Sequence, residues 1–423
     1  MALTVIALGT AWMGARQPAG LFALLGCGAV AAAAVPEMRR AVAIATGMIA
    51  LAFLNPVFSW YFAALVLGLA LARQRQGALF AAILVAGAIV LPKTAFARHY
   101  HEPGYWNWLN EPSLALALFV GALWWRARPD PARDRAVSSV EPTQDLAAFL
   151  LLFFSPGQAA YPMAFSPRTL AKHAPPASGE AIDLRRVGEQ LGWFVVKVAA
   201  LAALRAHAPF GFLRSLEAGT DVARIARVDL WGMVVSSYVE LYLALAASAD
   251  VPILIARLYG WTLPSPFRAA LLAWSPVELW RRWGIYNRQL LLQLVYFPLG
   301  GGRRHRTRNI MLTFLASALV LHSGWFGSKY WTIGPGGWRD ETIYFLLQGI
   351  AVCVCLAFSS GPPSDDGRAA GLPASSSSRS SWPGRAAGTV ATQTWSALVH
   401  VVVLAQGIDL ATRGRLLARC LGF

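Results

Sequence analysis

The sequence predicts an all-α protein that crosses a membrane many times, and three observations support that prediction. Of its 423 residues, 56% are hydrophobic and only 14% are charged, against roughly 25% charged residues in soluble domains. Apolar stretches recur along almost the whole chain, and about 20 such residues span the ~30 Å of hydrocarbon in a bilayer. These stretches are continuous rather than alternating, which favours helices over a membrane β-barrel.

The apolar stretches give the expected helices in order. The first half contains Ala2–Met13, Leu21–Val35, Ala41–Leu54, Trp60–Ala72, Leu79–Leu91 and Leu114–Trp125. After the polar segment at 126–143 come Leu146–Phe154, Leu191–Leu204, Leu230–Ala247, Leu290–Leu299, Ile310–Trp325, Ile343–Phe358 and a final helix near Thr394–Ala411. Because several stretches are short and two can form one kinked helix, we expect about ten to twelve transmembrane or re-entrant helices.

Polar segments divide the chain into five parts. Residues 1–125 form an amino-terminal transmembrane bundle, and 126–143 form a hydrophilic, Pro-rich loop. Residues 144–358 form a second membrane core. Residues 359–387, with the run Ser375–Ser378, contain too few apolar residues to order themselves and are predicted to be a disordered loop. Residues 388–423 hold the final transmembrane helix and a tail.

Charge and cysteine content exclude several classes of protein. The net charge of +16 comes largely from arginines in short segments between apolar stretches, at Arg39–Arg40, Arg73–Arg75, Arg281–Arg282 and Arg303–Arg308. That distribution is typical of cytoplasmic loops of membrane proteins, so no nucleic-acid partner is predicted. The four cysteines have no disulfide or metal spacing. We also find no phosphate loop and no nucleophile elbow, so any chemistry lies in the membrane.

No metal site and no permanently bound cofactor are predicted. The one stretch with metal-ligand character is His99-Tyr100-His101-Glu102, where alternate residues of an extended segment share a face. Two imidazoles without a further matching ligand favour an interfacial polar loop instead.

Ionisable groups at membrane depth are costly and therefore indicate functional sites. His322 is embedded in an apolar run, and its imidazole can take a proton from an attacking hydroxyl, as acyl transfer to an alcohol requires. The alternative is a core histidine bonded to a neighbouring carbonyl. Glu240 lies in a polar patch of another apolar helix, where an internal hydrogen bond between helices is as good an interpretation as catalysis.

A third element combines aromatic, basic and glycine residues. Ser275–Trp283 contains the pair Arg281–Arg282 between Trp280 and Trp283, and Tyr296-Phe297-Pro298-Leu299-Gly300-Gly301-Gly302 follows. Alone, an arginine pair flanked by tryptophans is usually an interfacial anchor. In this order and spacing, followed by Asn309 and His322, the segments resemble the membrane-bound O-acyltransferase family, especially its bacterial branch of alginate O-acetyltransferases and teichoic-acid D-alanyl transfer proteins. The likeness extends over roughly Ala147 to Trp331, and Lys197 and Asp250 also match.

The resemblance implies helices around a central tunnel and a multi-pass protein of the bacterial inner membrane. An acyl group, expected to be acetyl, would pass from a cytoplasmic thioester, acyl-CoA or acyl carrier, to a hydroxyl of a glycan, a lipid or a secreted metabolite. His322 would be the general base. The residues expected to bind substrate are Trp280, Arg281, Arg282, Trp283, Tyr296, Pro298 and Asn309. Arg303 and Arg304 would bind the phosphates of the donor, although the retention of positive charge on the cytoplasmic side explains these two arginines equally well. Membrane lipid and a periplasmic acyl-accepting protein are further expected partners.

The sequence also departs from the family pattern. Gly284 stands where the family usually has a polar residue, and only Asp250 remains of an acidic stretch before it. We expect Asn287, three residues beyond Gly284 on the same helix face, to supply the missing polar group. The alternative is a catalytically degenerate scaffold or transporter built on the same fold, although no internal repeat of the kind found in transporters is visible.

Overall fold

The structure is a computed structural model that describes residues 19–39, 182–207, 222–318, 337–358, 382–404 and 409–423, together with residue 173 and isolated positions between 41 and 49. Every regular element in these ranges is a helix, and none of the described residues forms a strand. The all-α prediction is therefore confirmed for the described residues. The expected total of ten to twelve helices includes stretches outside them.

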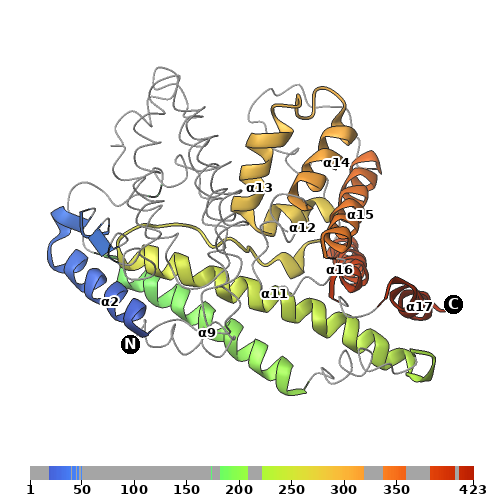
Figure 1. Ribbon diagram of the computed structural model, residues 1–423, viewed down its shortest axis with the longest axis horizontal. Coiled ribbons are helices and arrows are strands. Elements are labelled where there is room, and N and C mark those ends of the chain that lie inside the picture. The colour runs from blue at the N-terminus through green and yellow to red at the C-terminus, as the bar shows by residue number, and fades with distance from the viewer. Residues whose placement is uncertain are drawn as a thin grey trace, which may run out of the picture. The chain divides into compact units, whose positions relative to one another are not determined.

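Three helices are long and apolar enough to cross a membrane: Leu184–His207 (α9), Arg227–Leu258 (α11) and Asp340–Phe358 within Gly337–Phe358 (α15). Each contains one of the apolar stretches expected from the sequence. At about 1.5 Å per residue, α9 with its 24 residues exceeds the ~30 Å of hydrocarbon, and α11 with 32 exceeds it further. Figure 1 shows both as long uninterrupted ribbons. The chain is a membrane protein.

The chain divides into two compact units, and each is described by itself. The first comprises residues up to Ala199 and the segment Ala244–Ser265. Its described helices are Ala19–Ala34 (α2), Pro36–Met38 (η1), the first part of α9 and the last part of α11. Tyr259 donates a hydrogen bond from its hydroxyl to the Leu25 carbonyl at 3.1 Å. A side chain at Gly28 would collide with that tyrosine, so glycine permits this close packing.

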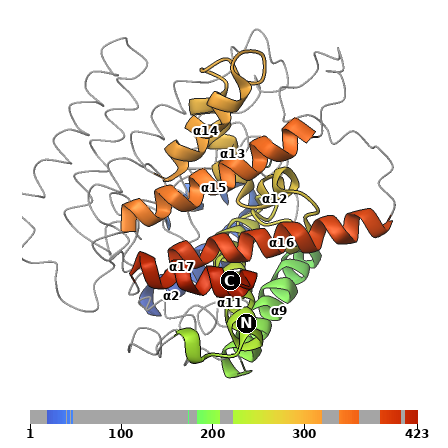
Figure 2. The ribbon, with the colours of Figure 1, turned by 90° about the vertical axis from the view of Figure 1, so that its right-hand side faces the viewer.

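The second unit contains residues 200–243 and 266–423. After η3 (Val222–Arg224) and the first part of α11, its elements are η4 (Ala270–Leu272), α12 (Pro276–Arg282), α13 (Ile285–Leu291), η5 (Leu292–Tyr296), α14 (Arg306–Ala316), α15, α16 (Trp382–Leu404) and α17 (Leu410–Leu421). Helix α15 packs against α14 and α16 (Figure 2) and also contacts α12. This packing gathers the motif-bearing short helices around α15.

Two boundaries differ from the sequence prediction. The predicted Leu290–Leu299 helix is instead the end of α13, the π-helical turn η5 and a glycine-rich loop. The final region is two helices rather than one, and α16 begins at Trp382, inside the segment predicted to be disordered. Pro383 in its first turn suits a helix start. Gly388 lets α16 approach the backbone of Trp274, because a Cβ at that position would lie 2.6 Å from the Trp274 carbonyl oxygen.

Candidate functional site

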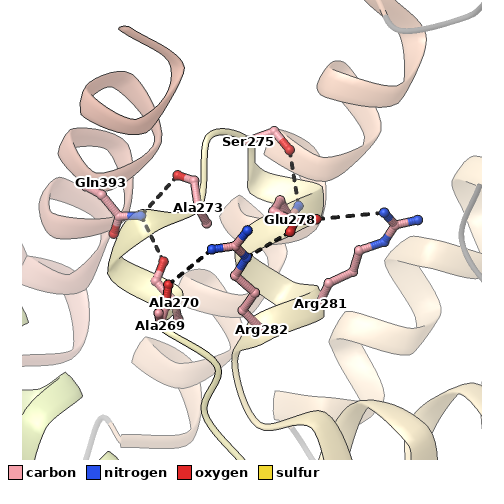
Figure 3. Close-up of polar contacts among 8 residues, drawn as sticks. All are labelled: Ala269, Ala270, Ala273, Ser275, Glu278, Arg281, Arg282 and Gln393. Carbon is pink, nitrogen blue, oxygen red and sulfur yellow. Dashed lines mark hydrogen bonds and ion pairs between the residues drawn. The ribbon is translucent and has the colours of Figure 1, made fainter. Parts of the chain in front are cut away.

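Helix α12 carries the Trp-Arg-Arg-Trp element and starts with a well-formed cap. The Ser275 hydroxyl accepts a hydrogen bond from the Glu278 backbone N–H at 3.1 Å, and Pro276 occupies the first helical position. The Glu278 carboxylate lies 2.8 Å from Arg282 Nε and 3.7 Å from Arg281 Nη1 (Figure 3). One carboxylate thus holds both arginines of the motif on the surface of a single short helix.

Trp274 and Gln393 fix the position of α12. The Arg282 guanidinium lies 5.0 Å above the Trp274 ring, and Arg385 of α16 lies 5.3 Å from the same ring. The Gln393 side-chain amide donates to the carbonyls of Ala270 and Ala273, just before α12 (Figure 3), and accepts from the Tyr238 hydroxyl at 3.0 Å. Helices α11, α12 and α16 are therefore joined by side-chain contacts around the motif.

Trp283 and Gly284 form the junction between α12 and α13. The Trp283 ring contacts Tyr238 at 6.1 Å and Tyr242 at 5.6 Å between centroids. Gly284 caps α13 in the left-handed region with φ of 55°, a conformation that most side chains disfavour. A Cβ at Gly284 would lie 3.8 Å from both Cβ and Nδ2 of Asn287. The Asn287 side chain thus occupies the neighbourhood into which a residue at 284 would project.

The glycine-rich loop after η5 is held by Asn309. This side chain is fully buried, and its Nδ2 lies 3.0, 2.9 and 2.7 Å from the carbonyl oxygens of Leu299, Gly301 and Arg304. The predicted substrate-binding residue therefore has an evident structural role. Pro298 is exposed on this loop, as are the two arginines predicted to bind the donor, Arg303 and Arg304.

Tyr296 lies beneath the loop and is 6% exposed. Burial raises the pKa of its hydroxyl, whereas the neighbouring Arg306 guanidinium acts in the opposite direction. Tyr296 belongs to a core cluster with Val277, Ile310 and residues of α15, against which Trp280 also packs. The aromatic-arginine element and the Tyr-x-Pro-Leu-Gly-Gly element, separated in sequence, thus share one core.

Two ion pairs involve further residues named in the sequence analysis. Glu240 Oε1 lies 2.6 Å from Arg205 Nε, linking α11 to α9. This is the interhelical interaction that the sequence left open as an alternative to catalysis. In the first unit, Lys197 Nζ lies 2.5 Å from Asp250, whose carboxylate also accepts a hydrogen bond from Ser265 at 3.2 Å. The lysine and the acid that match the family are therefore partners.

The predicted base, His322, and the His99–His101 stretch lie outside the described residues. Among the described residues no group of His, Cys, Asp or Glu has the geometry of a metal site. Several buried ionisable residues were not singled out from sequence, among them Asp340, Glu341, Arg413 and, in α16, His400, which is 1% exposed. The last of these lies in an apolar run. The usable signal was its position in the apolar run predicted as the final helix, since ionisable residues inside such runs are rare.

The chain has relatives among bacterial O-acetyltransferases. It is 29% identical over 178 residues to a peptidoglycan O-acetyltransferase of Helicobacter pylori, covering 40% of this chain and 30% of that protein. It is 28% identical over 114 residues to the probable alginate O-acetylase AlgI of Pseudomonas putida and of Pseudomonas aeruginosa, covering 26% of this chain and 22% and 21% of those proteins. The chain has homologues in the membrane-bound O-acyltransferase family. No family model matches it.

The O-acyltransferase resemblance is thereby confirmed at modest identity. The chain spans less than a third of the length of these relatives. The relationship therefore supports a common origin for the matched region.

Proposed function

We propose that this chain is a membrane-bound O-acyltransferase that moves an acyl group, expected to be acetyl, from a cytoplasmic thioester to a hydroxyl. A glycan is the favoured acceptor, because the relatives are named for peptidoglycan and alginate O-acetylation. A lipid or secreted metabolite offers the same hydroxyl chemistry. The observation that carries the proposal is the packing of Trp280 and Tyr296, from two family motifs, against one core cluster.

In the proposed step, the His322 imidazole takes the proton of the acceptor hydroxyl while its oxygen attacks the thioester carbonyl. The C–O bond forms, the C–S bond breaks, and the proton passes from the imidazolium to the departing thiolate. Nothing in this step needs a metal or a bound cofactor, and acyl-CoA or an acyl carrier enters only as donor substrate. A periplasmic partner that receives the acyl group is compatible with the same chemistry.

Substrate contacts are proposed for the α12 and loop residues. Arg303 and Arg304 are exposed cations beside the glycine-rich loop, which suits attraction of donor phosphates. Asn287 would supply the polar group absent at Gly284, which is supported by the 3.8 Å between its Nδ2 and the place a Cβ at position 284 would take. The part of the site that binds the acyl donor would be lined by Trp280, Trp283, Arg281, Arg282 and Pro298. Glu240 is proposed to act through its ion pair with Arg205 rather than on substrate.

The test is label transfer by purified protein. With radiolabelled acetyl-CoA and a soluble glycan oligomer, the wild-type chain should release labelled acetate or form labelled ester, and His322→Ala should abolish both. His207→Ala is the matched control, because His207 is an exposed histidine at the end of α9 and should leave turnover unchanged. Absence of His322-dependent turnover in folded protein would favour the alternative, a catalytically degenerate scaffold or transporter.

A further inference from the structure

His400 is a buried imidazole that the proposed reaction does not yet use. It is 1% exposed, and its Nε2 has no hydrogen-bond partner among the described residues. Buried polar atoms in folded proteins nearly always have a partner, either from the protein, from water or from a ligand. The bonding partner of His400 Nε2 therefore comes from outside the described part of the chain.

His400 belongs to a closed circuit of six aromatic side chains in the second unit. The ring-centroid distances around this circuit are Trp283–Tyr238 6.1 Å, Tyr238–His400 5.8 Å, His400–Tyr344 6.4 Å, Tyr344–Phe345 5.1 Å, Phe345–Trp280 5.8 Å and Trp280–Trp283 6.5 Å. The members come from α11, α12 with its C-cap residue, α15 and α16. Both tryptophans of the Trp-Arg-Arg-Trp element are thus in the same aromatic circuit as His400.

Polar groups accompany this circuit. Trp280 Nε1 is buried and, like His400 Nε2, has no hydrogen-bond partner among the described residues. Ser396 and Gln348, 1% and 0% exposed, lie beside the hydroxyls of Tyr238 and Tyr344. Sites that bind small ligand groups commonly combine aromatic side chains with a few polar groups, as these residues do. A purely structural core has no need of them, because burying such atoms costs stability.

One residue packed in this region lies close in sequence to the predicted base. Val399, which precedes His400, shares a core cluster with Tyr344 and Ala318, and Trp280 packs against that cluster. Ala318 is the last described residue before the segment that holds His322, which follows it by four residues. The buried imidazole therefore lies beside the point where the chain enters the predicted catalytic segment.

Building on the proposed function, we propose that His400 is a further substrate-binding residue of the acyl-transfer site, whose Nε2 hydrogen-bonds to the acceptor hydroxyl. A hydroxyl both donates and accepts, so it satisfies Nε2 in either imidazole tautomer, whereas a carbonyl satisfies only the protonated nitrogen. Gly284 follows Trp283, which is separated from His400 by Tyr238 alone. His400 and the residue before Gly284 thus contact the same tyrosine ring.

The experiment measures how the acetyl group partitions between water and an alcohol. Purified full-length protein is supplied with labelled acetyl-CoA and tetra-N-acetylchitotetraose, and labelled ester and free acetate are counted separately. His400→Ala should lower the ester-to-acetate ratio about tenfold, the effect of losing one hydrogen bond to the acceptor, and should retain hydrolysis. His400→Gln, which keeps a hydrogen-bonding side chain, should restore part of the ratio.

Val399→Ala is the matched control, because Val399 is equally internal, adjacent in sequence and apolar, and it should keep the wild-type ratio. If His400→Ala does not fold, the ester-to-acetate ratio of His400→Gln is compared with the ratios of Val399→Ala and the wild type instead. An unchanged ratio, or an equal fall of ester and acetate in folded variants, would overturn the role of His400. Wild-type protein whose turnover does not exceed that of His322→Ala would instead refute the proposed function.

Discussion

The clamp made by Asn309 gives a quantitative prediction about the glycine-rich loop. The Asn309 amide carries two N–H groups that face three loop carbonyls at 2.7–3.0 Å, and the side chain is fully buried. Each neutral hydrogen bond contributes about 0.5–1.5 kcal/mol net, so Asn309→Ala should weaken closure of the loop by about 1–3 kcal/mol. At about 1.4 kcal/mol per factor of ten, the open loop becomes about 5- to 150-fold more populated.

Limited trypsin digestion measures this opening directly. Arg303 and Arg304 are exposed, and cleavage after them requires the loop to leave its clamped conformation. When opening is fast relative to cleavage, the cleavage rate follows the open population, so it should rise by the same factor in Asn309→Ala. Mass spectrometry of the fragments assigns the cut to this loop and separates it from other exposed arginines.

Two variants sharpen the interpretation. Asn309→Asp keeps the shape of the side chain but removes both N–H donors. Trypsin should cleave this variant at least as fast as the alanine variant, because the carboxylate oxygens would face the loop carbonyl oxygens and repel them. Thr307→Ala changes an exposed residue in the same helical turn and should match wild type. Loop cleavage of Asn309→Ala within twofold of wild type would refute the assignment of Asn309 as the residue that closes the loop.

The remaining predictions concern the ion pair, the helix contact and the polar replacement. Lys197→Met should destabilise the protein by about 3–5 kcal/mol, because it leaves the fully buried Asp250 carboxylate without its cation. Adding Asp250→Asn to Lys197→Met should recover most of that loss, measured by thermal unfolding in detergent. Equal stability of the single and double variants would contradict this prediction. Gly388→Ala should lower the stability of the protein by about 1–3 kcal/mol, because the added Cβ would collide with the Trp274 carbonyl. Gly232→Ala has open space around it and should not lower stability. Equal effects of the two substitutions would show that α16 does not depend on its close approach to Trp274. Asn287→Ala should reduce acyl transfer about tenfold while preserving folding, as expected for one lost hydrogen bond, and full activity would show that Gly284 has no replacement there.

Long periodic features of the chain were predictable from sequence, and features that depend on contacts between segments were not. Helices α9, α11 and α15 were evident because runs of apolar residues long enough to span a bilayer have few alternatives. The break after α13 was missed, because the π-helical turn Leu292–Tyr296 has the apolar composition of a continuous α-helix. The early start of α16 was missed for a different reason: its first turns are rich in Ala and Gly, and the close approach of Gly388 to the Trp274 backbone cannot be seen in the sequence.

In the candidate site, too, sequence motifs could be recognised but the contacts between segments could not. Motif order identified Trp280, Tyr296 and Asn309, and the structure places the first two against a common core cluster. The family resemblance predicts Asn309 as a substrate residue, a prediction that stays untested, whereas its hydrogen bonds to the loop carbonyls could be learned only from the structure. His400 was overlooked because one histidine in an apolar run gains significance only from its neighbours, which come from α11 and α15.

The central claim is that the chain, with His322 as general base, transfers an acyl group from a donor on one side of a bilayer to a hydroxyl on the other. It is tested most directly with proteoliposomes that contain tetra-N-acetylchitotetraose inside and receive labelled acetyl-CoA only outside. Labelled ester should accumulate inside vesicles carrying the wild-type chain or His207→Ala, and should be absent with His322→Ala. Equal lumenal ester with His322→Ala, or none with folded wild-type protein, would contradict the account.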